Sequence, residues 1–340
     1  MNTLISEKYN KLYISWLITL ISLIILMIIV GGLTRLTDSG LSITQWQLFS
    51  GFLPPLNNED WIYYFNLYKQ IPEYKLQNFA MTMNEFKIIF WWEWIHRFLG
   101  RIIGIATLIP LIYFSFIFKI KDLINLYIIF FLICLQGFIG WYMVSSGLVD
   151  RVDVSHYRLS IHLFVAFLIL TCLFWNLLNF QSGKNKKFFL NSSNFYSIKF
   201  LVVLIFLQII FGAFVSGLDA GKIYQTWPTM NGSFFPNDID IKKLNEFFNF
   251  ENRSVVQFIH RNLAYIIFVF IVYIGYLILK INNTELYKPY FYLLIFVFLQ
   301  IFLGIFTLIS NLNIIIASTH QISSIFLIIF CINLYYKSIK

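Results

Sequence analysis

Four of the five histidines lie within long apolar stretches of the chain, and they are the side chains best suited to chemistry. These are His96, His162, His260 and His320. A titratable side chain inside a membrane-length apolar segment is costly, so it calls for a partner or a function. Two facing imidazoles can hold the iron of a haem from both sides. The pattern therefore predicts two axial pairs, His96 with His162 and His260 with His320.

A membrane histidine can also serve structure alone, by hydrogen-bonding to a neighbouring helix. Recurrence of the four histidines at matching places in the two halves of the chain favours the ligand interpretation. His156 differs because it lies in the short link from Asp150 to Tyr157 and has no counterpart in the other half. We interpret His156 as a loop residue.

Eight apolar runs are long enough to position these histidines within a membrane. Hydrophobic residues make up 59% of the chain and charged residues only 12%, unlike a soluble domain. A helix needs about 20 apolar residues to cross the hydrocarbon core. We predict spans at 14–33, 95–117, 124–146, 159–180, 197–217, 256–279, 289–310 and 313–336. The sequence thus predicts an all-α integral membrane protein, whose first run is a retained helix and not a signal peptide.

The two halves of the chain repeat each other. The segment from Gly31 to Trp46 recurs from Gly212 to Trp227 with the same spacing. Leu135-Gln136 recurs as Leu299-Gln300, at the offset of 164 residues that also separates the first histidine of each pair. The eight helices are therefore expected to form two similar units of four.

These units define the predicted domains, 1–180 and 197–340, joined by a polar linker at 181–196. Four spans return the chain to the side on which it started. The two halves should therefore have the same direction across the membrane, as parallel four-helix repeats.

Basic residues predict the orientation. The termini and the links on the same side hold twelve lysines against three acidic residues, which equals the whole net charge of +9. Basic loops face the cytoplasm, so both termini are expected there, with the histidines toward the outer face. For a bacterial chain this means the inner membrane. We interpret the positive charge as this orientation signal and not as a nucleic-acid-binding surface.

Glu93 distinguishes the two halves. It lies three residues before His96, on the same helical face, whereas Gln257 holds the matching place before His260. A carboxylate can accept a proton and an amide cannot, so the half with Glu93 is the natural reactive half. The alternative is an interfacial carboxylate that is hydrated or paired with Arg97.

Arginines accompany the histidines in both halves. Arg97 and Arg101 are four residues apart on one helical face, and Arg261 follows His260. Guanidinium groups bind carboxylates with two parallel hydrogen bonds, so these residues are candidates for holding haem propionates. Alternatively, they extend toward lipid headgroups.

Two long outer segments, 34–93 and 218–255, contain many aromatic residues and no cysteine. Cys134, Cys172 and Cys331 all lie in apolar runs, so we expect no disulfide in the outer segments and no thiol redox step. These segments could cap the bundle or admit a substrate, and the sequence leaves both alternatives open.

Taken together, the ordered motifs resemble the haem A synthase family along nearly the whole chain. The motifs are Gly31 to Ser42 with Trp46, Pro54-Pro55, Glu85-Phe86-Lys87, Glu93-x-x-His96-Arg97, Gly100-Arg101, Tyr157-Arg158-Leu159-x-x-His162-Leu163, Trp227-Pro228, Phe235-Pro236, His260-Arg261 and His320-Gln321. Each motif is weak alone, but the ordered set is specific. This chain resembles the cysteine-free branch of the family, found in mitochondria and related bacteria.

The resemblance implies an oxidoreductase that converts the C8 methyl group of haem O to the formyl group of haem A. It implies that His96 and His162 bracket the substrate haem, with Glu93 as a functional carboxylate. His260 and His320 would then bracket a haem b cofactor. Haem O synthase and cytochrome oxidase assembly factors are the implied partners, and whether the chain forms a homo-oligomer is left open.

Two other functions use the same features. A diheme cytochrome b that transfers electrons would need the four histidines but not Glu93. A transporter made of parallel repeats would place polar residues near the bilayer midplane, whereas here they gather near the outer surface. The Glu93 and Gln257 difference favours an enzyme over the cytochrome.

Overall fold

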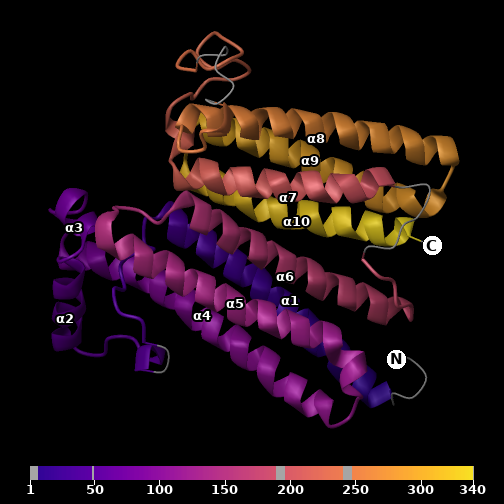
Figure 1. The fold of residues 1–340 in the computed structure, drawn as a ribbon, viewed down its shortest axis with the longest axis horizontal. Helices are drawn as coiled ribbons and strands as arrows, with labels where there is room; N and C mark the ends of the chain where they lie inside the picture. Colours follow the sequence, from indigo (N-terminus) through magenta and orange to yellow (C-terminus); the bar gives the residue numbers. More distant parts are fainter. Residues whose placement is uncertain (1–6, 48–49, 189–195, 240–246, 340) are drawn as a thin grey trace. The chain divides into compact units, whose positions relative to one another are not determined.

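The computed structural model describes residues 7–47, 50–188, 196–239 and 247–339, and within these ranges the chain is built of helices (Figure 1). Eight of the described helices are long and apolar enough to cross a membrane. They are α1 (Glu7–Leu36), α4 (Met83–Ser115), α5 (Ile120–Asp150), α6 (His156–Ser182), α7 (Tyr196–Gly217), α8 (Arg253–Ile281), α9 (Tyr287–Ile309) and α10 (Ile314–Ser338). The predicted all-α membrane fold with eight spans is confirmed.

The chain divides into two compact units. One contains residues 15–169, with most of α1, all of α4 and α5, and the first half of α6. The other contains residues 1–14 and 170–340, with α7 to α10. Each histidine pair therefore lies within a single unit.

In the second unit, α7 to α10 run side by side as a four-helix bundle (Figure 1). Helix α7 packs against α8 and α10, and α9 packs against α8 and α10, so the bundle is closed. Its interior is aliphatic: Leu201 and Ile205 of α7, with Ile271 and Ile274 of α8, are almost fully buried. Close packing of these side chains fixes which face of each helix turns inward.

In the first unit, hydrogen bonds between side chains and backbone carbonyls join neighbouring spans. The Trp16 indole of α1 donates to the Ala106 carbonyl of α4 over 2.8 Å. The Gln136 amide of α5 donates to the His162 carbonyl of α6 over 3.0 Å. Helices α4 and α5 also pack against each other.

The repeat is visible in the backbone where the first helix of each half ends. Asp38 and Asp219, which are equivalent in the repeat, both have left-handed backbone conformations with φ of 48° and 52°. Few residues other than glycine adopt this conformation, and aspartate is one that tolerates it. Both halves therefore turn the chain out of the helix in the same way.

Helix α4 begins much earlier than the predicted span at 95–117. Thr82 and Glu85 form a reciprocal capping box, so the helix starts at Met83. The apolar residues that follow, such as Phe86 and Phe90, are buried. The predicted start of this span at residue 95 is wrong, because the charge of Glu93 interrupted an apolar pattern that continues on both sides of it.

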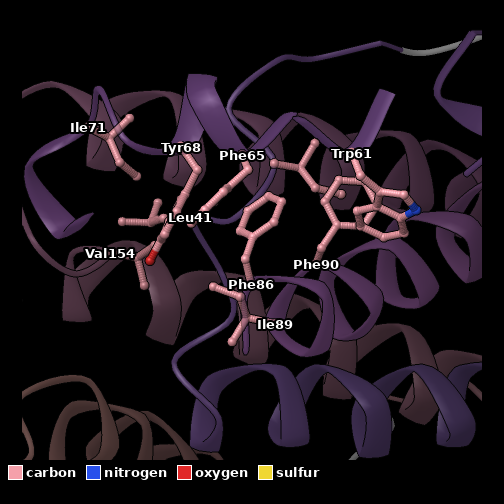
Figure 2. Packing of buried hydrophobic residues seen from close by; sticks show 10 residues of the cluster. Leu41, Trp61, Phe65, Tyr68, Ile71, Phe86, Ile89, Phe90 and Val154 are labelled. Atoms are coloured by element: carbon pink, nitrogen blue, oxygen red, sulfur yellow. The ribbon is translucent and has the colours of Figure 1, made fainter. Parts of the chain in front are cut away.

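The predicted outer segment contains two short helices, α2 (Asn58–Tyr68), which packs against the early part of α4, and α3 (Pro72–Leu76), which packs against α5. Figure 2 shows the buried cluster, rich in aromatic residues, that joins α2 to α4. The ring centres of Phe65 and Phe86 lie 4.9 Å apart, and those of Trp61 and Phe90 lie 5.0 Å apart. The outer segment is thus an ordered cap with its own apolar core, and the 3-10 turn at Ser50–Phe52 precedes α2.

One acidic side chain, Glu73 of α3, is buried in this cap and only 3% exposed. One carboxyl oxygen accepts hydrogen bonds from the Tyr68 hydroxyl (3.1 Å) and the Asn78 amide (3.3 Å). Burial raises the pKa of Glu73 from its ordinary value of 4.5 to about 8. The folded cap therefore favours the protonated acid.

Because the folded state binds this proton more tightly, the stability from Glu73 is full below pH 4.5 and falls as the pH rises to about 8. We expect Glu73→Gln to flatten this part of the pH profile, measured by thermal unfolding in detergent between pH 5 and 8. Glu59→Gln, at an exposed site, is the control and should keep the wild-type slope. An unchanged slope in Glu73→Gln would contradict the assignment.

Candidate functional site

The four histidines lie one on each even-numbered span of the predicted eight, on α4, α6, α8 and α10. His162, His260 and His320 lie about two turns from the start of their helices. His96 lies 13 residues into α4, about 20 Å along the helix from Met83. It is therefore well inside its helix.

His156 is not in a loop, contrary to prediction. It is the first residue of α6 and only 1% exposed. Its ring lies against that of Tyr157, with ring centres 4.0 Å apart. The prediction failed because the apolar run of α6 becomes recognisable only after Arg158.

The first unit brings His96 and His162 together. Their ring centres are 6.3 Å apart and the ring planes are inclined at 57°. An imidazole nitrogen lies about 2 Å from a metal that it binds, and the ring centre about 1 Å further, so an axial pair has ring centres about 6 Å apart. The observed separation fits a single metal centre between the rings.

In the second unit, His260 lies on α8 and His320 on α10. In both units the Nδ1 atoms of the paired histidines are buried and have no hydrogen-bond partner among the described residues. A buried polar atom without a partner costs free energy. Its recurrence at four equivalent positions fits imidazoles that serve a bound group and not the protein fold alone.

The Glu93 carboxylate is 3% exposed and held by three groups. One oxygen accepts from the Ser42 hydroxyl and from the Ile43 backbone N–H, each over 2.7 Å. The other oxygen forms an ion pair with Arg97 at 2.5 Å, one helical turn away. The pairing with Arg97 that the sequence left as an alternative is present, and it lies inside the protein.

In each half, the arginine that follows the first histidine of the pair is hydrogen-bonded to the chain segment after the first span of that half. Arg97 donates to the Ile43 carbonyl over 2.7 Å, and Arg261 donates to the Tyr224 carbonyl over 2.8 Å. Ile43 and Tyr224 are equivalent in the repeat. At Tyr224 the Gln257 amide donates to the same carbonyl over 2.9 Å, in place of the carboxylate of the first unit. Both units therefore share one anchor. The carboxylate of the first is buried, whereas the second has an exposed one, Asp238, which accepts from the Tyr224 hydroxyl over 2.7 Å.

The remaining guanidinium groups differ in how they are used. Arg101 donates to the Gln47 carbonyl over 2.7 Å. In Arg261, one terminal nitrogen is buried without a hydrogen-bond partner. Of the three arginine candidates for propionates, Arg97 is the one most fully used by the protein, through Ile43, Gln45 and Glu93.

Three glutamines contact the histidines, a role that the sequence analysis did not assign. Each lies on the helix before the histidine and donates its amide to the histidine's backbone carbonyl. The pairs are Gln136 with His162 (3.0 Å), Gln208 with His260 (3.1 Å) and Gln300 with His320 (2.9 Å). Gln136 and Gln300 were visible in the sequence as a repeated dipeptide, and this repetition was the available signal.

These features define a polytopic helical membrane protein with one buried imidazole pair in each of two repeated units. Comparison with known proteins then identifies the family. A family model described as cytochrome oxidase assembly protein, COX15-CtaA, matches residues 14–332. The chain belongs to this family.

The similar proteins support the same family assignment. The chain is 53% identical over 323 residues to a protein named heme A synthase from Pelagibacter ubique, and the match covers 94% of both chains. It is 42% identical to heme A synthase from Rickettsia bellii, over 94% of this chain and 97% of the relative. It is 41% identical to that from Wolbachia pipientis, over 92% and 88%. The family resemblance predicted from the motifs is confirmed.

The hydrogen bonds of Arg97 and Arg261 to equivalent backbone carbonyls allow the same substitution to be compared in both units. Arg97→Met leaves Glu93 buried without its countercharge, and removing one partner of a buried ion pair costs about 3–5 kcal/mol. Arg261→Met removes one donor from a carbonyl that keeps Gln257, which costs about 1 kcal/mol. We expect a clearly larger loss of thermal stability for Arg97→Met, measured in detergent. Adding Glu93→Gln to Arg97→Met should recover part of the loss, and equal losses at both arginines would contradict this account.

Proposed function

We propose that this chain is the oxidoreductase that converts haem O to haem A, by oxidising the C8 methyl group to a formyl group. One observation carries the proposal: among the described residues, only the first of the two repeat-related histidine pairs has a buried carboxylate one helical turn away. The likeness to proteins named heme A synthase supports it over nearly the whole chain. The product would serve the assembly of cytochrome oxidase, as the family description suggests.

The two pairs have different tasks in this proposal. His96 and His162, at a ring separation of 6.3 Å, hold the substrate haem O. His260 and His320 hold haem b, which when bound supplies electron transfer. The asymmetry between Glu93 and Gln257 is the reason for placing substrate in the first unit.

Glu93 is the proton-handling group in this proposal. Both of its oxygens are engaged by donors from Ser42, Ile43 and Arg97. These bonds fix the carboxylate within one turn of His96 and exclude water from it. The three donors leave one lone-pair position of the carboxylate, on the oxygen bonded to Arg97, and in this proposal Glu93 accepts the proton there.

The arginines have separate parts. Arg261, with a buried nitrogen that lacks a partner, is the best candidate for a propionate of haem b. Arg97 and Arg101 donate to backbone carbonyls of the outer segment. In this proposal they position that segment where it lines the substrate site. A contact to propionates from either would add to that role.

The membrane placement follows from the lysines. Both termini lie in the cytoplasm, the protein lies in the bacterial inner membrane, and the haem sites are toward its outer face. Haem O synthase and oxidase assembly factors are the partners that this placement would serve. A diheme cytochrome b is the second candidate, and it would leave Glu93 without a chemical task.

Expression in a host that makes haem O, followed by chromatography of the extracted haems, tests the function. We expect the wild-type chain to yield haem A and to carry haem b. His260→Ala and His320→Ala should each remove haem b, because one axial ligand is lost, while the protein still assembles in the membrane. Haem b without any haem A in the wild type would favour the electron-transfer cytochrome, and full haem b in both variants would refute the assignment of the second unit.

Glu93→Gln installs the amide that the second unit carries at the matching place. We expect haem b to stay at the wild-type level while haem A falls by about 10²-fold or more, in the range for loss of a general acid–base. Gln257→Ala is the control and should leave the product largely unchanged. Wild-type haem A from Glu93→Gln would make this carboxylate a structural residue.

A further inference from the structure

Each of the four histidine rings lies against a glycine of the preceding membrane span. If that glycine carried a Cβ atom, the atom would lie close to the Cε1 atom of the imidazole. The pairs are Gly31 with His96 (2.9 Å), Gly140 with His162 (3.0 Å), Gly212 with His260 (3.2 Å) and Gly304 with His320 (3.2 Å). Contacts this short leave no room for any larger side chain without moving the ring.

Some other helical glycines also have close contacts, Gly147 with Leu41 and Gly275 with Tyr290, but these contacts do not involve a histidine, and others have none. At Gly104 of α4 and Gly137 of α5, an added Cβ would meet nothing within 4 Å. Glycine within a helix costs about 1 kcal/mol relative to alanine. The four glycines under the histidines therefore have a local reason for their small size, which is the close approach of an imidazole.

The glutamine contacts belong to the same arrangement. Gln136, Gln208 and Gln300 each lie four residues before their glycine, so the amide and the bare backbone share one helical face. The glycine sets how near the ring lies to the neighbouring helix. The glutamine bond to the histidine carbonyl fixes the position of one helix along the axis of the other.

The fourth position departs from this pattern. Met27 lies four residues before Gly31, where the other helices have glutamine, and its thioether cannot donate a hydrogen bond. The nearest link between α1 and α4 is one turn away, where the Thr34 hydroxyl donates to the Trp92 carbonyl over 3.3 Å. Of the four paired histidines, His96 is thus the one whose backbone carbonyl accepts no hydrogen bond from a glutamine among the described residues.

We propose that the glutamine and glycine pairs are positioning elements for the four imidazoles, and that Met27 leaves His96 the least restrained of them. This inference rests on the proposed haem-binding function. With both axial places taken by imidazole, a haem has no free coordination site. The structure thus assigns His96 as the ligand most able to move during turnover.

The glycine part is tested with Gly140→Ala, Gly304→Ala and the matched control Gly137→Ala, three residues from Gly140 on α5. The full chain is purified from a host that makes haem O and haem b. Bound haem is quantified by chromatography, and axial ligation is followed by electron paramagnetic resonance of the ferric protein. We expect the haem dissociation constant to rise roughly 10–100-fold in the two test variants, as for other residues that orient metal ligands.

Specifically, Gly304→Ala should affect haem b, Gly140→Ala should affect haem O, and Gly137→Ala should match the wild type in content and spectrum. Wild-type haem content and an unchanged low-spin signal in both test variants would overturn the proposal. Equal loss in the control would also overturn it, because the effect would then belong to any alanine on the helix.

The glutamine part is tested with two reciprocal variants, which also guard against misfolding of the alanine variants. Gln300→Met gives the second unit the residue that the chain itself has at position 27, and haem b should dissociate about tenfold faster. Met27→Gln should slow the dissociation of haem O. Unchanged dissociation rates in both variants would refute a role for the glutamines.

Failure of this inference is distinguishable from failure of the proposed function. A wild type that binds haem at both sites but makes no haem A refutes the function and leaves the positioning test intact. A wild type that makes haem A while the glycine and glutamine variants bind haem normally refutes only the inference.

Discussion

Burial of imidazoles among apolar helices is the constraint on which this structure depends. A histidine in that setting has no water to satisfy its ring nitrogens, so the free-energy cost must be offset by a ligand or a neighbour. The four Nδ1 atoms have no hydrogen-bond partner among the described residues. Each ring packs against a glycine, and three of the four histidines also accept a glutamine bond at the backbone carbonyl.

The repeat makes the difference between the units informative. The anchors match closely, since Arg97 and Arg261 donate to equivalent carbonyls at Ile43 and Tyr224. Against this common frame, Glu93 takes the place of an amide that only donates to the backbone. The two units therefore differ at matching positions in a buried charge, and the proposed function depends on this difference.

The outer segment also takes part in the site. Its cap, which contains Phe65 and the buried Glu73, packs against the outer part of α4 at Phe86. The stretch before the cap supplies Ser42 and Ile43 to the carboxylate, and Gln47 to Arg101. Changes in the cap and changes at Glu93 are therefore expected to influence each other.

The sequence by itself determined the eight spans, the repeat, the histidine pairs and the family, because apolar run length and motif spacing are local properties. Only the tertiary structure decided the start of α4, the burial of His156 and the partners of Glu93. It also showed glycines of neighbouring spans in contact with all four histidines, and glutamines in contact with three of them. Such contacts join residues tens of positions apart, and which face of a helix meets which neighbour depends on the packing of the whole bundle, which no single segment encodes.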